Sequence, residues 1–444
     1  DLNGKIKDRI FHTDNNGQVT IDALDPGTYE LTEIKSNTYY NVGGKFNLTV
    51  SIDNNSKYNF ELQNGTNANG LTYDQTNNIL KNDYVRGNLI FKKFVQYQDG
   101  EEADHNIVKG NQEPLADVEF TLTADTSTTT NAGYANTATS GDDGTVTFAN
   151  IPVGEYTLKE IKKDGYDENS NEYKVTVKEV EDKNNKLYDD NGTAYNGKKA
   201  EISINPLLDT ANNNNSTLYN TPEKGTVTLT KVMNNNDTGL TGIDDKTLEG
   251  VEFGLYRKIN GIVASEPVYN ATSDSLGKVE FVNVEYGDYV CKEITDLPDF
   301  EKYTSEISMN RGEVTYDASI HTFSLNLGNV QNQLYKTNVK FHKQDQDNNS
   351  LSNVKFKLYR RSSEAITNTS TLTELRVSDD IRSYYPYLNN EVSSDDNGDF
   401  TLSNIPVGDY LLIENSGVSD LQDDHNKVAI HINITKTSVD VKFT

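Results

Sequence analysis

Short stretches in which hydrophobic and polar residues alternate run along most of this chain. In "GEYTLKE" (154–160), Tyr156, Leu158 and Glu160 alternate with polar residues, so in a β-strand all three point to one face. Turns rich in Asn, Asp and Gly separate such stretches, and we find no amphipathic helical pattern of useful length. The pattern therefore predicts an all-β fold of short strands packed as β-sandwiches.

The same stretch recurs at intervals of roughly 120–135 residues, a period that is too long for a solenoid unit and is typical of tandem domains. The copies are "GTYELTE" (27–33), "GEYTLKE" (154–160), "GDYVCKE" (287–293) and "GDYLLIE" (408–414). We expect four domains arranged as an elongated rod, of which the first lacks its opening strands and the last lacks the end of its final strand. Their expected bounds are 1–86, 87–223, 224–336 and 337–444.

Three polar residue types recur at matching places in these repeats. Each "GEYTLKE"-type strand ends in an inward Glu: Glu33, Glu160, Glu293 and Glu414. The apolar stripe of each opening strand ends in an inward Lys: Lys93, Lys231 and Lys343. The last segment of a repeat carries an Asn: Asn82, Asn220 and Asn332.

Burying such groups is costly, so their recurrence needs a reason. One interpretation is a structural Lys–Glu ion pair with an Asn hydrogen-bonded beside it. The other is amide exchange, because a Lys in an apolar pocket is held as a neutral, nucleophilic amine and the Asn offers an amide carbonyl. A buried carboxyl group favours its protonated form, can hydrogen-bond that carbonyl and can pass a proton to the leaving ammonia. The product is an intramolecular isopeptide bond, made once per domain without a cofactor.

Composition excludes several classes of function. A net charge of −27 excludes nucleic acid and anionic lipid as partners, and no apolar run approaches the roughly 18 residues of a membrane span. The single Cys, Cys291, cannot form an intramolecular disulfide and fits a small core residue, and the six His lack zinc-site spacing. The segments 345–349 and 241–247 offer oxygen ligands for calcium, but a plain polar turn is the simpler interpretation. We expect no metal, no cofactor and no enzyme site beyond the single-turnover chemistry.

An opening-strand Lys, a "GxYxLxE" strand and a terminal Asn together resemble the B-type domains of the Cna collagen adhesin and the SpaA-like domains of Gram-positive pilins. The resemblance covers nearly the whole chain. It implies a reverse-immunoglobulin, prealbumin-like sandwich with a Lys–Asn isopeptide bond promoted by Glu. It also implies an extracellular shaft or stalk that is anchored to the Gram-positive cell surface and contacts neighbouring domains or subunits of the same fibre.

Transferred to this sequence, the resemblance pairs Lys93 with Asn220 under Glu160 and Lys231 with Asn332 under Glu293. The first domain offers Glu33 with Asn82, and the last offers Lys343 with Glu414. In the last domain, Val439, Val441 and Phe443 share a face. The partner Asn is therefore expected at the next inward position, just past Thr444.

Two explanations remain for the incomplete end domains: this chain is cut from a longer array, which we favour, or a neighbouring copy supplies strands in a strand-exchanged filament. A ligand-binding adhesin region is the alternative function. Its contacts with host molecules would lie in the insertions at 123–141 and 384–390. A third possibility is that these domains space an enzyme located elsewhere.

Overall fold

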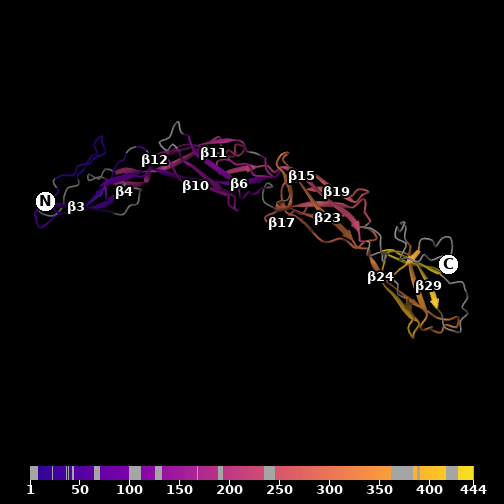
Figure 1. The fold of residues 1–444 in the computed structure, drawn as a ribbon. Helices are drawn as coiled ribbons and strands as arrows, with labels where there is room; N and C mark the ends of the chain where they lie inside the picture. The colour runs from indigo at the N-terminus through magenta and orange to yellow at the C-terminus, as the bar shows by residue number, and fades with distance from the viewer. Residues whose placement is uncertain are drawn as a thin grey trace. The chain divides into compact units, whose positions relative to one another are not determined.

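Strands form nearly all the regular structure of the computed structural model, together with the 3₁₀ helix η2 (Arg311–Glu313) (Figure 1). The prediction of an all-β fold is thus confirmed. The structure describes residues 9–22, 24–36, 38, 40–42, 45–64, 71–99, 112–125, 133–167, 169–188, 194–234, 246–361, 384–387, 391–416 and 429–443. They form two compact units: residues 1–97 with 112–221, and residues 98–111 with 222–444.

The first unit contains a first domain of two small sheets, β1–β2–β3 and β4–β5, and a larger second domain. The strands of the first domain are β1 (Gly27–Thr32), β2 (Lys45–Ile52), β3 (Tyr58–Asn64), β4 (Leu71–Asp74) and β5 (Ile79–Asn82). Those of the second domain are β6 (Arg86–Gln96), β7 (Gln112–Pro114), β8 (Glu119–Ala124), β9 (Ala135–Thr139), β10 (Thr145–Pro152), β11 (Gly154–Glu160), β12 (Glu172–Tyr188), β13 (Ala194–Asn205) and β14 (Thr217–Asn220).

The second unit contains the third and fourth domains. The strands of the third are β15 (Lys224–Met233), β16 (Glu252–Ile259), β17 (Ile262–Val263), β18 (Tyr269–Thr272), β19 (Lys278–Glu285), β20 (Tyr289–Glu293), β21 (Ile307–Met309), β22 (Thr315–Asp317) and β23 (Thr322–Asn332). Those of the fourth are β24 (Lys336–His342), β25 (Lys355–Arg361), β26 (Tyr384–Pro386), β27 (Val392–Ser393), β28 (Asp399–Pro406), β29 (Gly408–Ser416), β30 (Ala429–Ile434) and β31 (Val439–Phe443).

The second and third domains are each built from two sheets, and the opening and closing strands are parallel neighbours in one of them. That sheet is β10–β6–β14 in the second domain and β19–β15–β23–β22 in the third. In the register of β6 and β14, Lys93 lies opposite Leu218 and Val95 opposite Asn220. A Lys and an Asn far apart in sequence are thereby placed on adjacent strands.

Alternation along the strands decides which residues form the core. On β6, Leu89, Phe91 and Val95 are buried on the face that also carries Lys93. Phe91 packs edge-to-face on Phe120 of β8, with ring centroids 5.1 Å apart. Burying each such side chain contributes about 1.5–3 kcal/mol, so this face holds the two sheets together.

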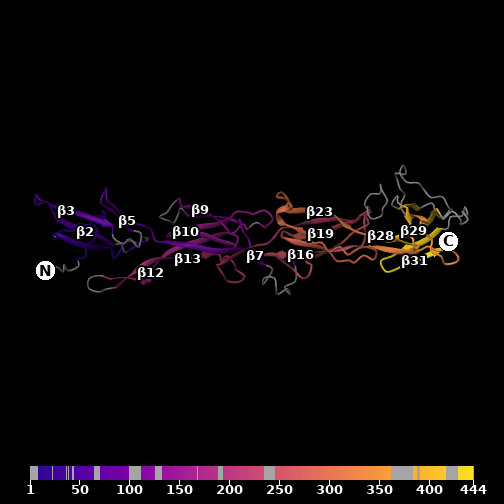
Figure 2. The ribbon, with the colours of Figure 1, turned by 90° about the horizontal axis from the view of Figure 1, so that it is seen from below.

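The second domain also extends a long hairpin of β12 and β13, which Figure 2 shows reaching toward strands of the first domain. Lys198, near the hairpin's outer end, donates a hydrogen bond of 3.2 Å to the Ser36 hydroxyl and pairs with Glu179 at 3.1 Å. The hairpin therefore contacts the first domain within the first unit.

The last strand lies in a different place from the one expected from the sequence. β31 pairs antiparallel with β30, at the end of the sheet that contains β25 and β29, and not beside β24. Val439 and Val441 are each 39% exposed, so they do not face a core. β31 is therefore not a closing strand beside β24, whereas the expected partner Asn past Thr444 stays a prediction.

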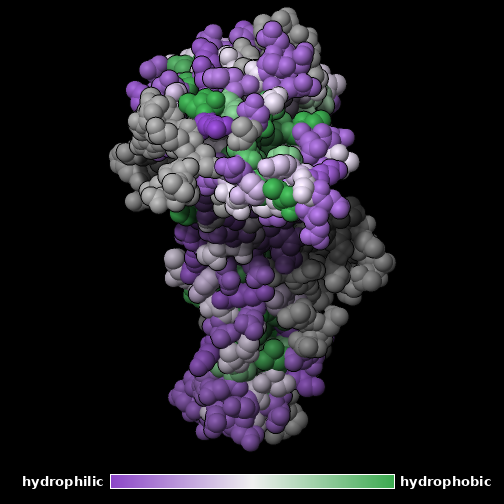
Figure 3. Space-filling view, turned by 90° about the vertical axis from the view of Figure 1, so that its left-hand side faces the viewer, coloured by the Kyte–Doolittle hydropathy of each residue, from purple (hydrophilic) through white to green (hydrophobic). Residues whose placement is uncertain are grey.

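The surface agrees with the acidic composition. Hydrophilic residues cover most of the described surface visible in Figure 3, and hydrophobic ones are scattered between them. In the described part of the chain, no helix has the length and hydropathy that a membrane crossing requires.

Candidate functional site

In the second domain, Lys93, Asn220 and Glu160 meet in the buried interior. The Lys93 Nζ donates a hydrogen bond of 2.5 Å to the Asn220 Oδ1 and lies 3.0 Å from the Glu160 Oε2. The Asn220 Nδ2 donates to the Glu160 Oε1 at 2.5 Å. The side chains of Lys93 and Glu160 are 0% and 1% exposed. One carboxylate thus contacts both the amine and the amide nitrogen.

Burial changes the chemistry of the amine. Loss of water around the Lys93 ammonium lowers its pKa to about 8, although the adjacent Glu160 carboxylate opposes the shift. A neutral amine is therefore reached within the ordinary pH range. Neighbouring Lys92 faces outward and pairs with Asp143 at 2.6 Å.

The third domain repeats the same arrangement. The Lys231 Nζ donates to the Asn332 Oδ1 and lies 2.8 Å from the Glu293 Oε2, and the Asn332 Nδ2 donates to the Glu293 Oε1 at 2.8 Å. Lys231 is fully buried, and burial lowers its pKa. In the register of β15 and β23, Met233 lies opposite Asn332, as Val95 does opposite Asn220.

A glycine turn fixes the backbone of each of these lysines. The backbone N–H of Lys93 donates to the Gly144 carbonyl, and that of Lys231 to the Gly277 carbonyl, both at 2.7 Å. Both glycines have positive φ. A Cβ on Gly277 would lie 2.4 Å from the Lys231 carbonyl oxygen, so only glycine fits this close approach.

The end domains each bring two of the expected residues together. In the first domain, the Asn82 Nδ2 donates to both Glu33 carboxylate oxygens, at 2.9 and 2.8 Å, and to the Asn41 carbonyl. In the fourth, the Lys343 Nζ lies 3.0 Å from the Glu414 Oε2. These two side chains are 28% and 32% exposed, so their pocket is much wetter than those of the second and third domains.

Comparison with known proteins identifies these repeats. A family model described as the SpaA prealbumin-like fold domain matches residues 1–66, 105–193, 225–321 and 337–444. The chain belongs to this family. The predicted SpaA-like, prealbumin-type fold is therefore confirmed.

Several solved structures are similar to this array of SpaA-type domains at low identity. They include the Bacillus anthracis TIE protein (14% identical, covering 91% of this chain and 60% of that one, TM-score 0.31). Also similar is a Streptococcal ancillary pilin (15% identical, covering 80% of this chain and 98% of that one, TM-score 0.22). A third is a variant of BcpA, the major pilin subunit of Bacillus cereus (16% identical, covering 72% of this chain and 89% of that one, TM-score 0.21). No curated protein matches the chain significantly. At these values the family assignment rests on the sequence match alone.

Two further residues at the SpaA-type sites were not predicted from the sequence. The Asn169 Nδ2 donates to the Glu160 Oε2 at 3.4 Å, and the Tyr303 ring centroid lies 5.3 Å from the Lys231 Nζ. Asn169 and Tyr303 occupy equivalent places in the two domains. Asn169 lies four residues before Tyr173, the strand partner of Leu158. Tyr303 lies four residues before Ile307, the strand partner of Cys291, which matches Leu158 in the repeat. Neither lies in a recurring motif, so only a residue-by-residue alignment of the strand pairs could have revealed them.

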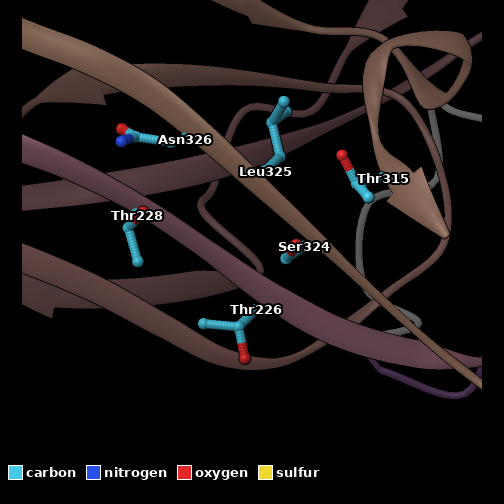
Figure 4. A pocket seen from close by; sticks show the side chains of 6 residues that line it. All are labelled: Thr226, Thr228, Thr315, Ser324, Leu325 and Asn326. Carbon is cyan, nitrogen blue, oxygen red and sulfur yellow. The ribbon is translucent and has the colours of Figure 1, made fainter. Parts of the chain in front are cut away.

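Other candidate sites have less chemistry. A shallow hollow of about 420 Å³ on the third domain contains no ionisable side chain and is lined by Thr226, Thr228, Thr315, Ser324, Leu325 and Asn326 (Figure 4). At 345–349, Asp345 accepts hydrogen bonds from the Asp347 and Asn349 N–H groups, as in a polar turn. Burial raises the pKa of the Cys291 thiol to about 12, which keeps it unreactive.

Parts of three segments singled out from the sequence lie outside the described residues. They are 126–132 of the first insertion, 388–390 of the second, and 241–245 of the candidate calcium turn.

Proposed function

We propose that this chain is a structural shaft or stalk on the surface of a Gram-positive bacterium, in a pilus or an adhesin, and that Lys–Asn isopeptide bonds stabilise its domains. The observation that carries the proposal is the buried Lys–Asn–Glu contact found in both the second and the third domain. Membership of the SpaA family supports it. The partners that fit this function are neighbouring domains and subunits of the same fibre.

The reaction is an amide exchange within each domain. The proton shared by Lys93 and Glu160 moves to the carboxylate, which leaves a neutral amine. The Nζ attacks the Asn220 amide carbon and forms the new C–N bond, the old bond to Nδ2 breaks, and ammonia leaves with the proton that Glu160 delivers. Glu160 then takes the surplus proton from the linking nitrogen, so the new amide is neutral and the carboxyl group ends protonated. The sequence led us to expect Glu160 at the amide oxygen, but its contact with Nδ2 favours the role of proton carrier.

Folding supplies the positioning that the reaction needs. The amine and the amide are already in contact across adjacent strands, and such proximity can lower a barrier by about 7–11 kcal/mol. The Glu160 carboxylate and the Asn220 amide supply the hydrogen bonds that water would otherwise make to the Lys93 amine. A separate catalyst is unnecessary, and each domain reacts once.

The product would link the first strand of a domain to its last. Lys93 and Asn220 are 127 residues apart, and Lys231 and Asn332 are 101 apart. Closing loops of this length removes entropy from the unfolded chain worth about 5 kcal/mol each, by the model used for disulfides. That is comparable to the whole stability of a small domain and needs no oxidising conditions.

The domains at either end carry parts of the same constellation. Glu33 with Asn82 supplies a carboxylate and an amide, and Lys343 with Glu414 supplies an amine and a carboxylate. We assign these pairs to the same chemistry. Within residues 1–444 we expect bonds only in the second and third domains, which lie in the proposed domain bounds 87–223 and 224–336.

Intact mass under denaturing conditions tests the proposal. The expected mass is that of the sequence less two molecules of ammonia. Glu160→Gln should abolish one loss and Glu293→Gln the other, because each removes the proton carrier of one domain. Glu172→Gln is the matched control, since Glu172 is an exposed β12 carboxylate paired with Lys159. An unmodified mass for the parent chain would refute the proposed chemistry.

A further inference from the structure

A carboxylate in the third domain occupies a place where the sister domains have proline. The corner before the "GxYxLxE" strand reads "VEYG" here, whereas the second and fourth domains read "IPVG". The odd residue, Glu285, ends β19 and is 0% exposed. A buried carboxylate is costly unless partners satisfy it, so its surroundings indicate a purpose.

Its partners are a buried arginine and the backbone of a distant segment. The Glu285 Oε1 accepts a hydrogen bond of 2.7 Å from the Gln98 N–H, and its Oε2 accepts one of 3.2 Å from the Asp99 N–H. The Arg257 guanidinium pairs with the same Oε2 at 2.6 Å and donates to the Asp99 carbonyl at 2.5 Å. Arg257 is 3% exposed and lies over the Tyr289 ring.

The Asp99 side chain has a binding place of its own. Its Oδ2 accepts hydrogen bonds from the Lys224 Nζ at 2.7 Å and from the Tyr269 hydroxyl at 2.8 Å. The Tyr269 oxygen also accepts a hydrogen bond from the Glu285 N–H at 3.1 Å. Backbone and side chain of the segment are therefore both recognised by one connected polar network.

The fourth domain shows what the network replaces. At the position of Arg257 it has Arg360, which lies over Tyr410 and donates to the Val407 carbonyl within the same domain. At the position of Glu285 it has Pro406, which has no acceptor side chain. The two carboxylate oxygens that accept from consecutive N–H groups are thus found in the third domain and not in the second or fourth, which have proline at this place.

We propose that Arg257, Glu285, Lys224 and Tyr269 form a receptor for the Gln98–Asp99 segment, which acts as an intrachain latch. The sequence places this segment in the connection between β6 and β7 of the second domain, yet Gln98 and Asp99 group with the second compact unit. Its ligand chemistry is an extended backbone with two adjacent N–H donors followed by a carboxylate. Release of the segment would leave the buried Arg257–Glu285 pair without three of its hydrogen bonds, which strongly disfavours opening.

Hydrogen–deuterium exchange of the Gln98 and Asp99 amides in the full chain tests the latch. Glu285→Gln removes the charge that holds both amides, and the loss of charge-assisted hydrogen bonds should speed their exchange by about tenfold to a hundredfold. Glu280→Gln, on the same strand but in an exposed pair with Lys278, is the control and should leave exchange unchanged.

A second variant covers the case in which Glu285→Gln disturbs the third domain. Asp99→Ala alters only the partly exposed ligand side chain, and it should also speed exchange of the Gln98 amide. Unchanged protection of both amides in both variants would overturn the latch. The ammonia losses of the same samples report separately on the proposed function, because neither Lys–Asn–Glu site includes a residue of the latch.

Discussion

At the scale of single residues, burial decides what the recurring lysines can do. Lys93 is fully enclosed and its pKa falls to about 8, while Lys343 in the fourth domain is 28% exposed. The same residue type at the same repeat position thus has two different environments. Loss of water disfavours the ammonium form, so we expect the reactive neutral amine in the enclosed pockets of the second and third domains.

The protonation of the pair predicts the pH dependence of bond formation. The reactive pair, a neutral Lys93 amine beside a protonated carboxyl, holds the same single proton as the ion pair. That proton is lost as the pH rises through about 8, and with it the acid that releases ammonia. The ammonia-loss rate of the second domain should therefore be level just below pH 8 and fall above it by about tenfold per unit.

Newly synthesised chain, sampled by intact mass at successive times in the Glu293→Gln background, gives this rate. A rate that keeps rising above pH 8 would show that a neutral amine alone suffices and that the shared proton is not needed.

At the scale of elements, the turn before each inner strand holds the reactive lysine in place. Gly144, Gly277 and Gly398 each accept a hydrogen bond of 2.7 Å from the lysine N–H of the neighbouring opening strand. A Cβ on any of them would lie 2.3–2.4 Å from the carbonyl oxygen of that lysine. The sequence shows the glycines as turn residues, but the closeness to the lysine backbone comes from the strand pairing.

Gly277→Ala should therefore slow bond formation in the third domain. Its left-handed φ of +72° alone costs alanine about 1–2 kcal/mol, and the contact with the Lys231 backbone adds the cost of moving β15. Gly261→Ala is the matched control, because Gly261 has a φ of +80° and nothing within 4 Å of an added Cβ.

The left-handed backbone should lower the free energy of unfolding by a similar amount in both variants, as measured by chemical denaturation. Only Gly277→Ala should delay the ammonia loss of the third domain. Equal rates in the two variants would mean that the turn does not position Lys231.

At the scale of the whole molecule, the proposed bonds would determine how the chain carries tension. A bond between Lys93 and Asn220 passes force directly from the opening to the closing strand of the second domain. The chain between Lys93 and Asn220, which spans 127 positions, would then carry none of the applied force. The latch at Gln98–Asp99 lies inside this shielded loop, so it would hold without bearing the load.

Single-molecule stretching should reveal the shielding. The parent chain is expected to release no length from the second or third domain. Glu160→Gln should unfold the second domain and release up to roughly 430 Å, from 127 residues at about 3.4 Å each. Glu172→Gln should behave like the parent chain, and a full-length release from the parent would contradict a covalent link.

The sequence alone indicated an all-β fold, the buried faces of the recurring strands, and the Lys, Glu and Asn that meet in the second and third domains. This was possible because period-two alternation assigns each side chain to a face, and repetition shows which polar residues share an inward place. Tyr156, Leu158 and Glu160 illustrate this, since the first two are core residues and the third reaches its buried partners.

Only the tertiary structure decided which strands become neighbours and how buried charges are satisfied. Alternation placed Val439 and Val441 on one face, but it could not tell that β31 joins β30 and leaves that face exposed. The contact of Gln98 with Glu285 spans 187 residues and depends on the path of the chain. A local pattern contains no information about that path, because pairing partners are selected by long-range packing and by the need to give every buried polar group a partner.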